Sequence, residues 1–375
     1  MSDSTRHCTL STWLGDHQDK HALLDALAER PAQWLSGKSE CSEIIISSRI
    51  RLARNLNNFL FARKLRPADA SKLLKTVSSS VERVSRLDGF VSLNLNTLTS
   101  IEKAILVERR LISPNFAQKK KPRSLIIGPQ EQISLMINEE DHLRIQAMQP
   151  ALGLREAWKN ISAFDAELSE HLDYAFSDEL GYLTACPTNV GTGLRASIFI
   201  HLPALKDSEK INAVLQELGP NEITIRGFYG EGSRMLGDIY QISNQLTLGR
   251  VEGRIIDRMV LVAGRLVELE KAERKRLDLI KVEDRVLRAI AILQAEKLLE
   301  TNELLRLLSE VRLGSDLGII EPISCALLNE LIVLSQSAHL QKIMKREMDT
   351  RRRDQARAVF VRQKLSLSKH PYLEE

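Results

Sequence analysis

Aromatic residues and long apolar runs are both scarce in this chain of 375 residues. Tryptophan, tyrosine and phenylalanine together make up 5% of it, which disfavours a surface that stacks nucleic-acid bases on aromatic rings. No stretch approaches the roughly 18 uninterrupted apolar residues that a membrane helix needs. The first 15 residues lack the basic start and apolar run of a secretion signal. We therefore expect a cytoplasmic protein that binds neither membranes nor, directly, nucleic acid.

Cysteines are also few, and their spacing excludes two further classes. Cys8, Cys41, Cys186 and Cys325 are far apart, so neither a disulfide framework nor a zinc site is expected. Charged residues are plentiful but nearly balanced, with 53 basic and 49 acidic side chains and a net charge of +4. This excess is too small to imply nucleic-acid binding by itself. We expect free thiols and no metal ion held by protein ligands alone.

Hydrophobic patterning divides the chain into four parts. Residues 1–43 form a polar, partly helical extension, strand-like runs follow from residue 44, helical spacing replaces them from about residue 253 to 365, and residues 366–375 form a tail. Short turns between the strand-like runs predict antiparallel pairing. The expected fold is therefore α+β, an antiparallel sheet flanked by helices followed by an all-helical domain.

Some local elements follow from the same patterns. The stretch up to about residue 88 is expected to form a small, mixed first lobe of the domain. Helices are expected over residues 67–84, 153–172 and 207–218, a strand over residues 138–146, a hairpin turn at residues 128–132 and a turn at residues 314–318.

The run CPTNVGTGLR at residues 186–195 places a thiol, two glycines, two threonines and an arginine between apolar segments. Glycines let a backbone approach an anion closely, threonines add hydroxyl donors, and the fork of Arg195 matches phosphate oxygens. A Gly-Thr-Gly turn is also common in hairpins and β-bulges. Taken alone, the run leaves both interpretations open.

Five arginines lie beside turns or strand ends, namely Arg49, Arg51, Arg144, Arg195 and Arg226. Each one alone also fits a solvated surface charge. If they converge on one cleft, their mutual repulsion calls for a polyanion such as a nucleoside triphosphate. Phosphoryl transfer depends mainly on positioning and charge neutralisation, which such a cluster supplies. The sequence contains neither a P-loop nor the protein-kinase motifs, so another architecture is required.

Four motifs in order resemble the phosphagen (guanidino) kinase family: SSRIR at residues 47–51, NEEDHLR at 138–144, CPTNVGTGLR at 186–195 and RGFYGEGS at 226–233. The last of these, with IYQISNQ at residues 239–245 and RLGSDLG at 312–318, looks closest to the bacterial protein-arginine kinases. The resemblance covers about residues 44–362. It implies a phosphagen-kinase-like catalytic domain over residues 44–270 and a helical regulatory and dimerisation domain over residues 271–365.

The resemblance also implies a nucleotide site, with Mg²⁺ held mainly through the nucleotide phosphates. Its ATP-binding residues would be Ser47, Ser48, Arg49, Ile50, Arg51, Arg110, Arg144, Arg195, Ala196, Ser197, Ile198, Phe199, Arg226, Gly227, Phe228, Tyr229, Gly230 and Glu231.

An acceptor guanidinium would lie between Glu140 as base and Glu231 as clamp. A guanidinium is protonated at neutral pH and is a poor nucleophile, so a positioned carboxylate is needed to orient it and to accept its proton. Cys186 would contact the same group as a thiolate, which a positive cleft favours. A cysteine on a strand is also often a small buried hydrophobic residue.

A fifth motif, RDQARA at residues 353–358, resembles the phosphoarginine-binding, activating pocket of protein-arginine kinases. Its residues would be Arg353, Asp354, Arg357 and Ala358. A spacing of four places the two arginines on one helical face, where they could grip a phosphoryl group. A basic, solvated helix is the alternative.

Three positions depart from the family pattern. Arg110 stands where these kinases usually carry a histidine that contacts nucleotide, and Arg234 and Asp238 replace a glutamate and an asparagine. These departures therefore leave open whether the activity is reduced.

The leading hypothesis is an enzyme that transfers the ATP γ-phosphoryl group to arginine side chains exposed on proteins. A kinase for free arginine or another small guanidino compound, and a phosphoarginine-binding adaptor with an impaired kinase site, are the alternatives. The helical domain favours protein substrates, and intact Glu140, Cys186, Arg195 and Glu231 oppose an adaptor. The resemblance further implies a homodimer, a zinc-binding activator protein, and delivery of phosphorylated proteins to a Clp-type unfoldase and protease in stress regulation.

Overall fold

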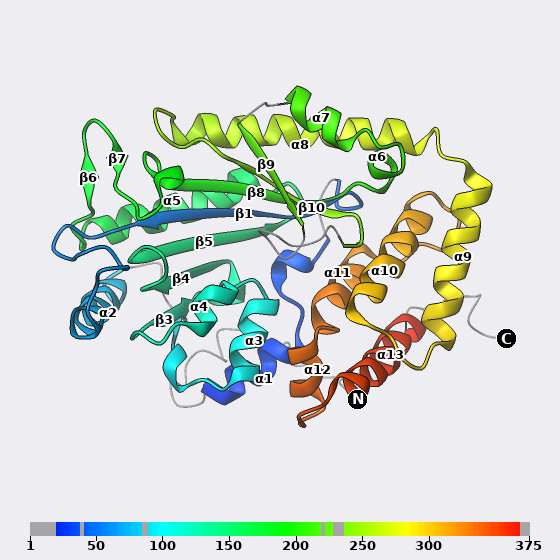
Figure 1. Cartoon of the computed structure of the whole chain (residues 1–375), viewed down its shortest axis with the longest axis horizontal. Coiled ribbons are helices and arrows are strands. Elements are labelled where there is room, and N and C mark those ends of the chain that lie inside the picture. The colour runs from blue at the N-terminus through cyan, green and yellow to red at the C-terminus, as the bar shows by residue number, and fades with distance from the viewer. Residues whose placement is uncertain (1–19, 38–40, 85–88, 219–221, 228–235, 368–375) are drawn as a thin grey trace, which may run out of the picture.

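The computed structural model describes residues 20–37, 41–84, 89–218, 222–227 and 236–367. An antiparallel sheet of eight strands runs through the molecule in the order β2-β3-β4-β5-β1-β8-β10-β9 (Figure 1). The strands are β1 (Ile45–Arg54), β2 (Val91–Asn94), β3 (Ser124–Ile127), β4 (Ile133–Ile137), β5 (Leu143–Pro150), β8 (Leu194–His201), β9 (Ile223–Gly227) and β10 (Ile239–Asn244). A separate hairpin joins β6 (Phe176–Ser177) to β7 (Gly181–Tyr182).

Helices surround this sheet. They are α1 (Lys20–Glu29), α2 (Pro67–Val81), α3 (Ser100–Glu108), α4 (Pro114–Gln118), α5 (Leu154–Ser169), α6 (Pro203–Asp207), α7 (Ile211–Leu218), α8 (Glu252–Arg274), α9 (Leu279–Ala295), α10 (Thr301–Asp316), α11 (Cys325–Leu334), α12 (Ser337–Ile343) and α13 (Thr350–Leu367). Short 3-10 turns are η2 (Gln33–Leu35), η3 (Leu95–Thr97), η4 (Pro129–Glu131) and η5 (Pro187–Asn189). No helix within the described ranges is long and apolar enough to span a bilayer.

Strand β1 lies in the middle of the sheet, and its Ile50 and Leu52 side chains are buried in the core on one face. It pairs with β5 on one side and β8 on the other, and nearly all of it is buried. Ile45 packs in the core that contains α5 and α8, whereas Ile46 packs in the core that contains the C-terminal helices. The stretch expected as a small first lobe therefore supplies the central strand of one continuous sheet.

The sheet and helices α2, α5 and α8 share the first of these cores. The buried residues of α8 recur at the spacing of one helical face, from Ile255 and Met259 to Leu266, and they pack with Ile198 of β8. Figure 1 shows α8 lying along the sheet. The boundary between the sheet-bearing part and the helical part thus falls after α8 rather than before it.

Helices α9 to α13 surround a second core that reaches into the sheet. Phe199 of β8, Met148 of β5 and Trp34 of η2 belong to it together with residues such as Leu308 and Leu331. The C-terminal helices therefore pack directly against the sheet face that carries the arginines. This shared core is what brings the helical part close to the site described below.

The expected turn at residues 314–318 begins later than its glycines suggested. Gly314 lies inside α10, where a Cβ atom would collide with the Val286 side chain of α9. Its glycine permits close helix packing, and only Gly318, with φ +70°, follows the end of the helix.

Two other expected elements also differ. Residues 207–218 are not one helix: Pro203 starts α6, Asp207 ends it, and Glu209, with φ +57°, separates it from α7. Residues 138–142 form a turn before β5, with Asn138 at φ +68°. In the first part of the chain, Leu24, Leu27 and Trp34 are buried.

Candidate active site

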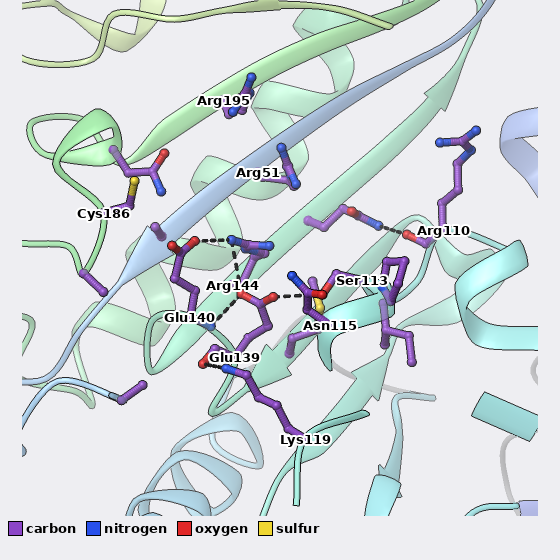
Figure 2. A pocket seen from close by; sticks show the side chains of 18 of the residues that line it. Arg51, Arg110, Ser113, Asn115, Lys119, Glu139, Glu140, Arg144, Cys186 and Arg195 are labelled. Atoms are coloured by element: carbon purple, nitrogen blue, oxygen red, sulfur yellow. Dashed lines mark hydrogen bonds and ion pairs between the residues drawn. The ribbon is translucent and has the colours of Figure 1, made fainter. Parts of the chain in front are cut away.

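A cavity of about 1140 Å³ lies over the middle of the sheet. All six arginines expected in the nucleotide site line it, together with Glu140 and Cys186. Figure 2 shows Arg51, Arg144 and Arg195 close to one another, Cys186 on one side of them and Arg110 on the other. The arginines, in chain order, are Arg49, Arg51, Arg110, Arg144, Arg195 and Arg226. The convergence expected from their positions at turns and strand ends is thus present.

Strand alternation explains why these side chains share one face. Arg51 lies opposite Arg195 on β8 and opposite Gln146 on β5, and Arg144 is two residues before Gln146. Residues directly opposite, and those two along, point to the same side of a sheet. Arg226 on β9 lies opposite Gln241 on β10, which also lines the cavity.

Burial and mutual repulsion make the arginine-rich part of the cavity electrostatically unfavourable by itself. Burial, followed by Arg110, Arg195, Arg144 and Arg226, lowers the pKa of Arg49 to about 9. Burial and then Arg49 hold the pKa of Arg51 well below its usual value. The Nε atoms of both are buried without a hydrogen-bond partner within the described part of the chain. An anion with several oxygens would relieve the repulsion and satisfy these donors.

The ring of Phe199 contacts two arginines of the cavity, Arg49 and Arg110. The guanidinium carbon of Arg110 lies 4.2 Å from its centroid and that of Arg49 lies 5.3 Å away. Cation–π contacts of this kind orient guanidinium planes without neutralising their charge. These contacts therefore orient the two guanidinium groups, and their positive charge stays available to bind an anionic ligand.

The other part of the cavity is acidic. Arg144 donates to Glu140 Oε2 at 3.0 Å and forms an ion pair with Glu139 Oε2 at 3.1 Å. The Ser113 hydroxyl donates to Glu139 at 2.9 Å, and the Lys119 ammonium donates to the Glu139 carbonyl oxygen (Figure 2). Burial opposes ionisation of Glu139, but Arg144, the Glu140 amide, Ser113 and Lys119 outweigh it and lower its pKa. Glu140 is less buried, with 45% of its side chain exposed.

A buried hydrogen-bond network fixes the turn that carries both glutamates. The Asn55 amide at the end of β1 donates to Asp141 at 2.7 Å, and the backbone amide of Ala185 donates to the same oxygen at 2.6 Å. His142 accepts from the Leu56 amide through Nδ1, so its Nε2 donates to the Leu60 carbonyl at 2.8 Å. Asp141 thus ties the glutamate turn to the residue before Cys186.

The glycines of the 186–195 run are required by the chain's own packing. A Cβ atom at Gly191, with φ +110°, would meet the Thr247 carbonyl at 2.5 Å, and one at Gly193, with φ +64°, would meet the Ala53 carbonyl at 2.6 Å. The close approach expected toward a phosphate is therefore made toward neighbouring backbone. The Cys186 sulfur lies 3.1 Å from the Thr188 hydroxyl, at the cavity.

The geometry agrees with comparisons to known proteins. Residues 72–273 match the model of the ATP:guanido phosphotransferase C-terminal catalytic domain, and residues 279–374 match that of the protein-arginine kinase McsB C-terminal domain. A protein-arginine kinase of Desulforamulus reducens is 43% identical over 351 residues, covering 92% of this chain and 98% of the relative. The chain belongs to the protein-arginine kinases of the ATP:guanido phosphotransferase family. The family expected from the four motifs is confirmed.

A further relative agrees with this chain in length, and two solved structures share its fold. The Bacillus subtilis protein-arginine kinase is 40% identical over 353 residues, covering 93% of this chain and 96% of that protein. Lombricine kinase aligns with a TM-score of 0.56 at 21% identity, over 67% of this chain and 76% of its own. A duplicated taurocyamine kinase of Schistosoma mansoni aligns with a TM-score of 0.59 at 24% identity, over 66% of this chain and 35% of its own. These structures share the fold, which confirms the expected fold class.

Several residues expected in the nucleotide site of this phosphagen kinase do not line the cavity. The side chains of Ser48, Ile50, Ala196 and Ile198 are buried because they alternate with the arginines along β1 and β8. Ile50, Ala196 and Ile198 pack in the first core, and Ser48 donates to the Ala151 carbonyl at 2.6 Å. Ser47, Ser197 and Gly227 are buried as well. Phe228, Tyr229, Gly230, Glu231 and Arg234 lie outside the described residues, as does Cys8. Cys41, Cys186 and Cys325 are free thiols, as expected.

The RDQARA motif of the kinase divides into two parts. Arg357 is 1% exposed and donates to the carbonyls of Ser335 and Leu299, at 2.9 and 2.7 Å, and to Asp354 at 2.6 Å. Arg353 is only half-buried and donates to the Met348 carbonyl at 3.2 Å. The two arginines therefore do not share an exposed face. Arg357, like the buried Ala358, faces the neighbouring helices.

Other residues of the site had no motif to mark them. Ser113, Asn115 and Lys119 come from the segment that includes α4, and Gln146 and Gln241 come from strands. Ile332 of α11 and Gln336, just after it, also line the cavity. Their places depend on tertiary packing, so no sequence signal would have found the last two.

Proposed function

We propose that this phosphagen kinase transfers the γ-phosphoryl group of ATP to arginine side chains of proteins. The observation that carries the proposal is a single cavity whose lining is arginine-rich in one part and contains Glu139, Glu140 and Cys186 in the other. Relatives about 40% identical over nearly the whole chain are protein-arginine kinases. The match to their C-terminal domain, residues 279–374, favours a protein acceptor over a free metabolite.

The arginine-rich part suits the triphosphate of ATP. Guanidinium groups bind phosphate oxygens in pairs, and Arg49, Arg51 and Arg195 approach one another from adjacent strands. A bare divalent cation does not fit among these positive charges, so Mg²⁺ would enter with phosphate oxygens as its main ligands. When bound, Mg²⁺ neutralises charge on the transferring phosphoryl group.

The acidic part suits the acceptor. One oxygen of Glu140 is held by Arg144, and the other would orient the incoming guanidinium and take its proton. The acceptor nitrogen attacks the γ-phosphorus, the bond from that phosphorus to the β-phosphate oxygen breaks, and ADP leaves. Cys186 would contact the guanidinium as a thiolate, and Glu231 would be the second carboxylate.

A direct assay tests this function. Incubation with ATP, Mg²⁺ and an unstructured arginine-rich protein should yield acid-labile phosphate on the protein, and Glu140→Gln should form it far more slowly. Parallel reactions with free arginine separate a metabolite kinase, which would phosphorylate free arginine in preference to the protein. Binding of phosphoarginine without any transfer would instead indicate an adaptor.

We further propose the wider setting that the family suggests. The kinase would act in the cytoplasm as a homodimer through residues 271–365, with a zinc-binding activator protein and a Clp-type unfoldase as partners. The catalytic part would comprise residues 44–270, with residues 1–43 as an extension. The two matched families, divided between residues 273 and 279, support that division. Sedimentation of the whole chain over a range of protein concentrations would test the dimer.

A further inference from the structure

The helical part of the chain forms one wall of the catalytic cavity. Ile332 and Gln336 line it, although both belong to the region after residue 279. Glu108, the last residue of α3, lines the same cavity on the sheet side. The two walls meet where α12 packs against α1 and α3.

Glu108 joins these walls through three hydrogen bonds. Its carboxylate accepts from the backbone amides of Ala338 and His339, at 2.8 and 3.1 Å, and from His339 Nδ1 at 2.7 Å. Its side chain is 15% exposed and that of His339 is fully buried. Burial lowers the pKa of His339, so a neutral ring donates from Nδ1. A carboxylate at the first amides of a helix is electrostatically favourable.

The next two residues, Arg109 and Arg110, connect this junction to the cavity. Arg109 is buried and binds the Glu131 carboxylate, with Nε at 2.9 Å, and the Arg30 carbonyl, also at 2.9 Å. Arg110 follows with φ +62°, its carbonyl accepts from Gln146 at 2.8 Å, and its guanidinium lies over Phe199. A left-handed conformation is costly for arginine and persists only when neighbouring bonds impose it.

We propose that Glu108 is a positioning residue for nucleotide binding: by tying α12 to the turn at residues 108–110, it lets the helical domain set the place of Arg110 in the cavity. Among the charged neighbours of Arg49, Arg110 lowers its pKa most, so the position of Arg110 bears directly on the cationic part. The inference rests on the proposed function, because it assigns the arginine-rich part to nucleotide phosphates.

Glu108→Gln in the full chain tests the link, because glutamine keeps the volume and loses the charge that binds three donors. We expect the Kd for ATP to rise about tenfold and KM for ATP to rise with it, while kcat changes less. His339→Leu, which removes the Nδ1 donor from the other side of the junction, should shift Kd in the same direction. Asp25→Asn is the matched control, since Asp25 pairs with Lys342 of α12 at 2.7 Å without touching this turn.

A double-substitution cycle shows whether Glu108 acts through Arg110. In an Arg110→Met background, Glu108→Gln should leave the already weakened ATP affinity unchanged. If the double variant raises the Kd for ATP by the product of the two single fold-changes, the proposal is overturned. An unchanged Kd in Glu108→Gln alone would also overturn it. A general loosening of the interface would make Asp25→Asn weaken ATP binding equally, and that result would also overturn it. If the wild-type chain does not bind ATP, the proposed function itself is wrong, and this outcome is distinct from a failure of the Glu108 link.

Discussion

Arg144 and Glu140 form an ion pair at 3.0 Å inside the cavity, and the same Arg144 nitrogen lies 3.1 Å from Glu139. One arginine thus stands between the cationic cluster and the two carboxylates. Glu139 is almost fully buried, whereas nearly half of the Glu140 side chain is exposed. The two glutamates therefore have different parts to play, Glu139 holding the turn and Glu140 facing the open cavity.

Glu140→Gln should reduce phosphoryl transfer by about 10²- to 10⁴-fold, because it removes the proposed proton acceptor. ATP should still bind, since the arginines stay in place. Initial rates of acid-labile phosphate formation and a separate ATP titration measure the two effects. Glu179→Gln, at an exposed position of the β6–β7 connection, is the control. A full rate in Glu140→Gln would exclude Glu140 as the base.

Arg49→Met should stabilise the protein without nucleotide by about 1–2 kcal/mol, because it removes a buried charge that its neighbours repel. The same change should weaken ATP binding at least about tenfold by loss of a phosphate donor. Urea unfolding measures the expected gain in stability, and ATP titration measures the expected loss of affinity.

Arg54→Met is the contrasting variant. Arg54 is buried but paired with Asp165 at 2.7 Å, so its loss should destabilise by about 3–5 kcal/mol. Equal destabilisation in both variants would contradict the repulsion.

Cys186 should react with iodoacetamide before the other cysteines, because it lies at the cavity surface beside cationic side chains. ATP together with an arginine ligand should protect it. Mass spectrometry of partially labelled protein gives the order of modification, with Cys41 and Cys325 as internal references. Uniform labelling, or labelling that ligands do not slow, would argue against a thiolate at the acceptor site.

Stability should fall as the pH drops from 7 toward 5. Burial holds the pKa of His201 well below its ordinary value and lowers that of His339. The unfolded chain binds protons at these groups near pH 6.5 while the folded chain does not, so acid favours unfolding. For each pH unit by which the folded chain lowers a histidine pKa, the free energy of unfolding gains about 1.4 kcal/mol. This stability is present above pH 6.5 and is lost as the pH falls below it.

Thermal melts between pH 5 and pH 7.5 measure this dependence. His201→Gln should flatten it, because His201 binds the Ser309 hydroxyl through Nε2 at 2.8 Å and links the sheet to α10. His171→Gln, at an exposed histidine, should leave the slope unchanged. An unaltered slope in His201→Gln would assign the acid sensitivity to other groups.

The two arginines of the RDQARA motif should behave differently. Arg357→Ala should destabilise the helical part by about 3–5 kcal/mol, because it leaves the part-buried Asp354 and two carbonyls without their partner. Arg353→Ala should keep the folded stability and lose any stimulation by phosphoarginine, if the proposed pocket acts through Arg353. Urea unfolding and kinase assays with added phosphoarginine separate the two. Equal stability of the two variants would contradict the burial of Arg357.

Much of the site is local in the sequence. Arg49 and Arg51 share a face because strands alternate with a period of two, and Glu139 and Glu140 share a turn because they are adjacent. Bringing Arg51, Arg144 and Arg195 together then required β5, β1 and β8 to pair in the observed register. The same alternation buried Ile50, Ala196 and Ile198, which the family motif had grouped with the arginines.

The sequence by itself determined which chemical groups this protein has and which of them share a strand face, because alternation and turn residues act over a few positions. It did not determine the wall formed by Ile332 and Gln336, the inward turn of Arg357 or the link from Glu108 to α12. Only the tertiary structure decided these. They depend on how the second core, which contains both Phe199 and the C-terminal helices, docks on the sheet. That docking sums many weak apolar contacts between distant segments, and no short motif records such a sum.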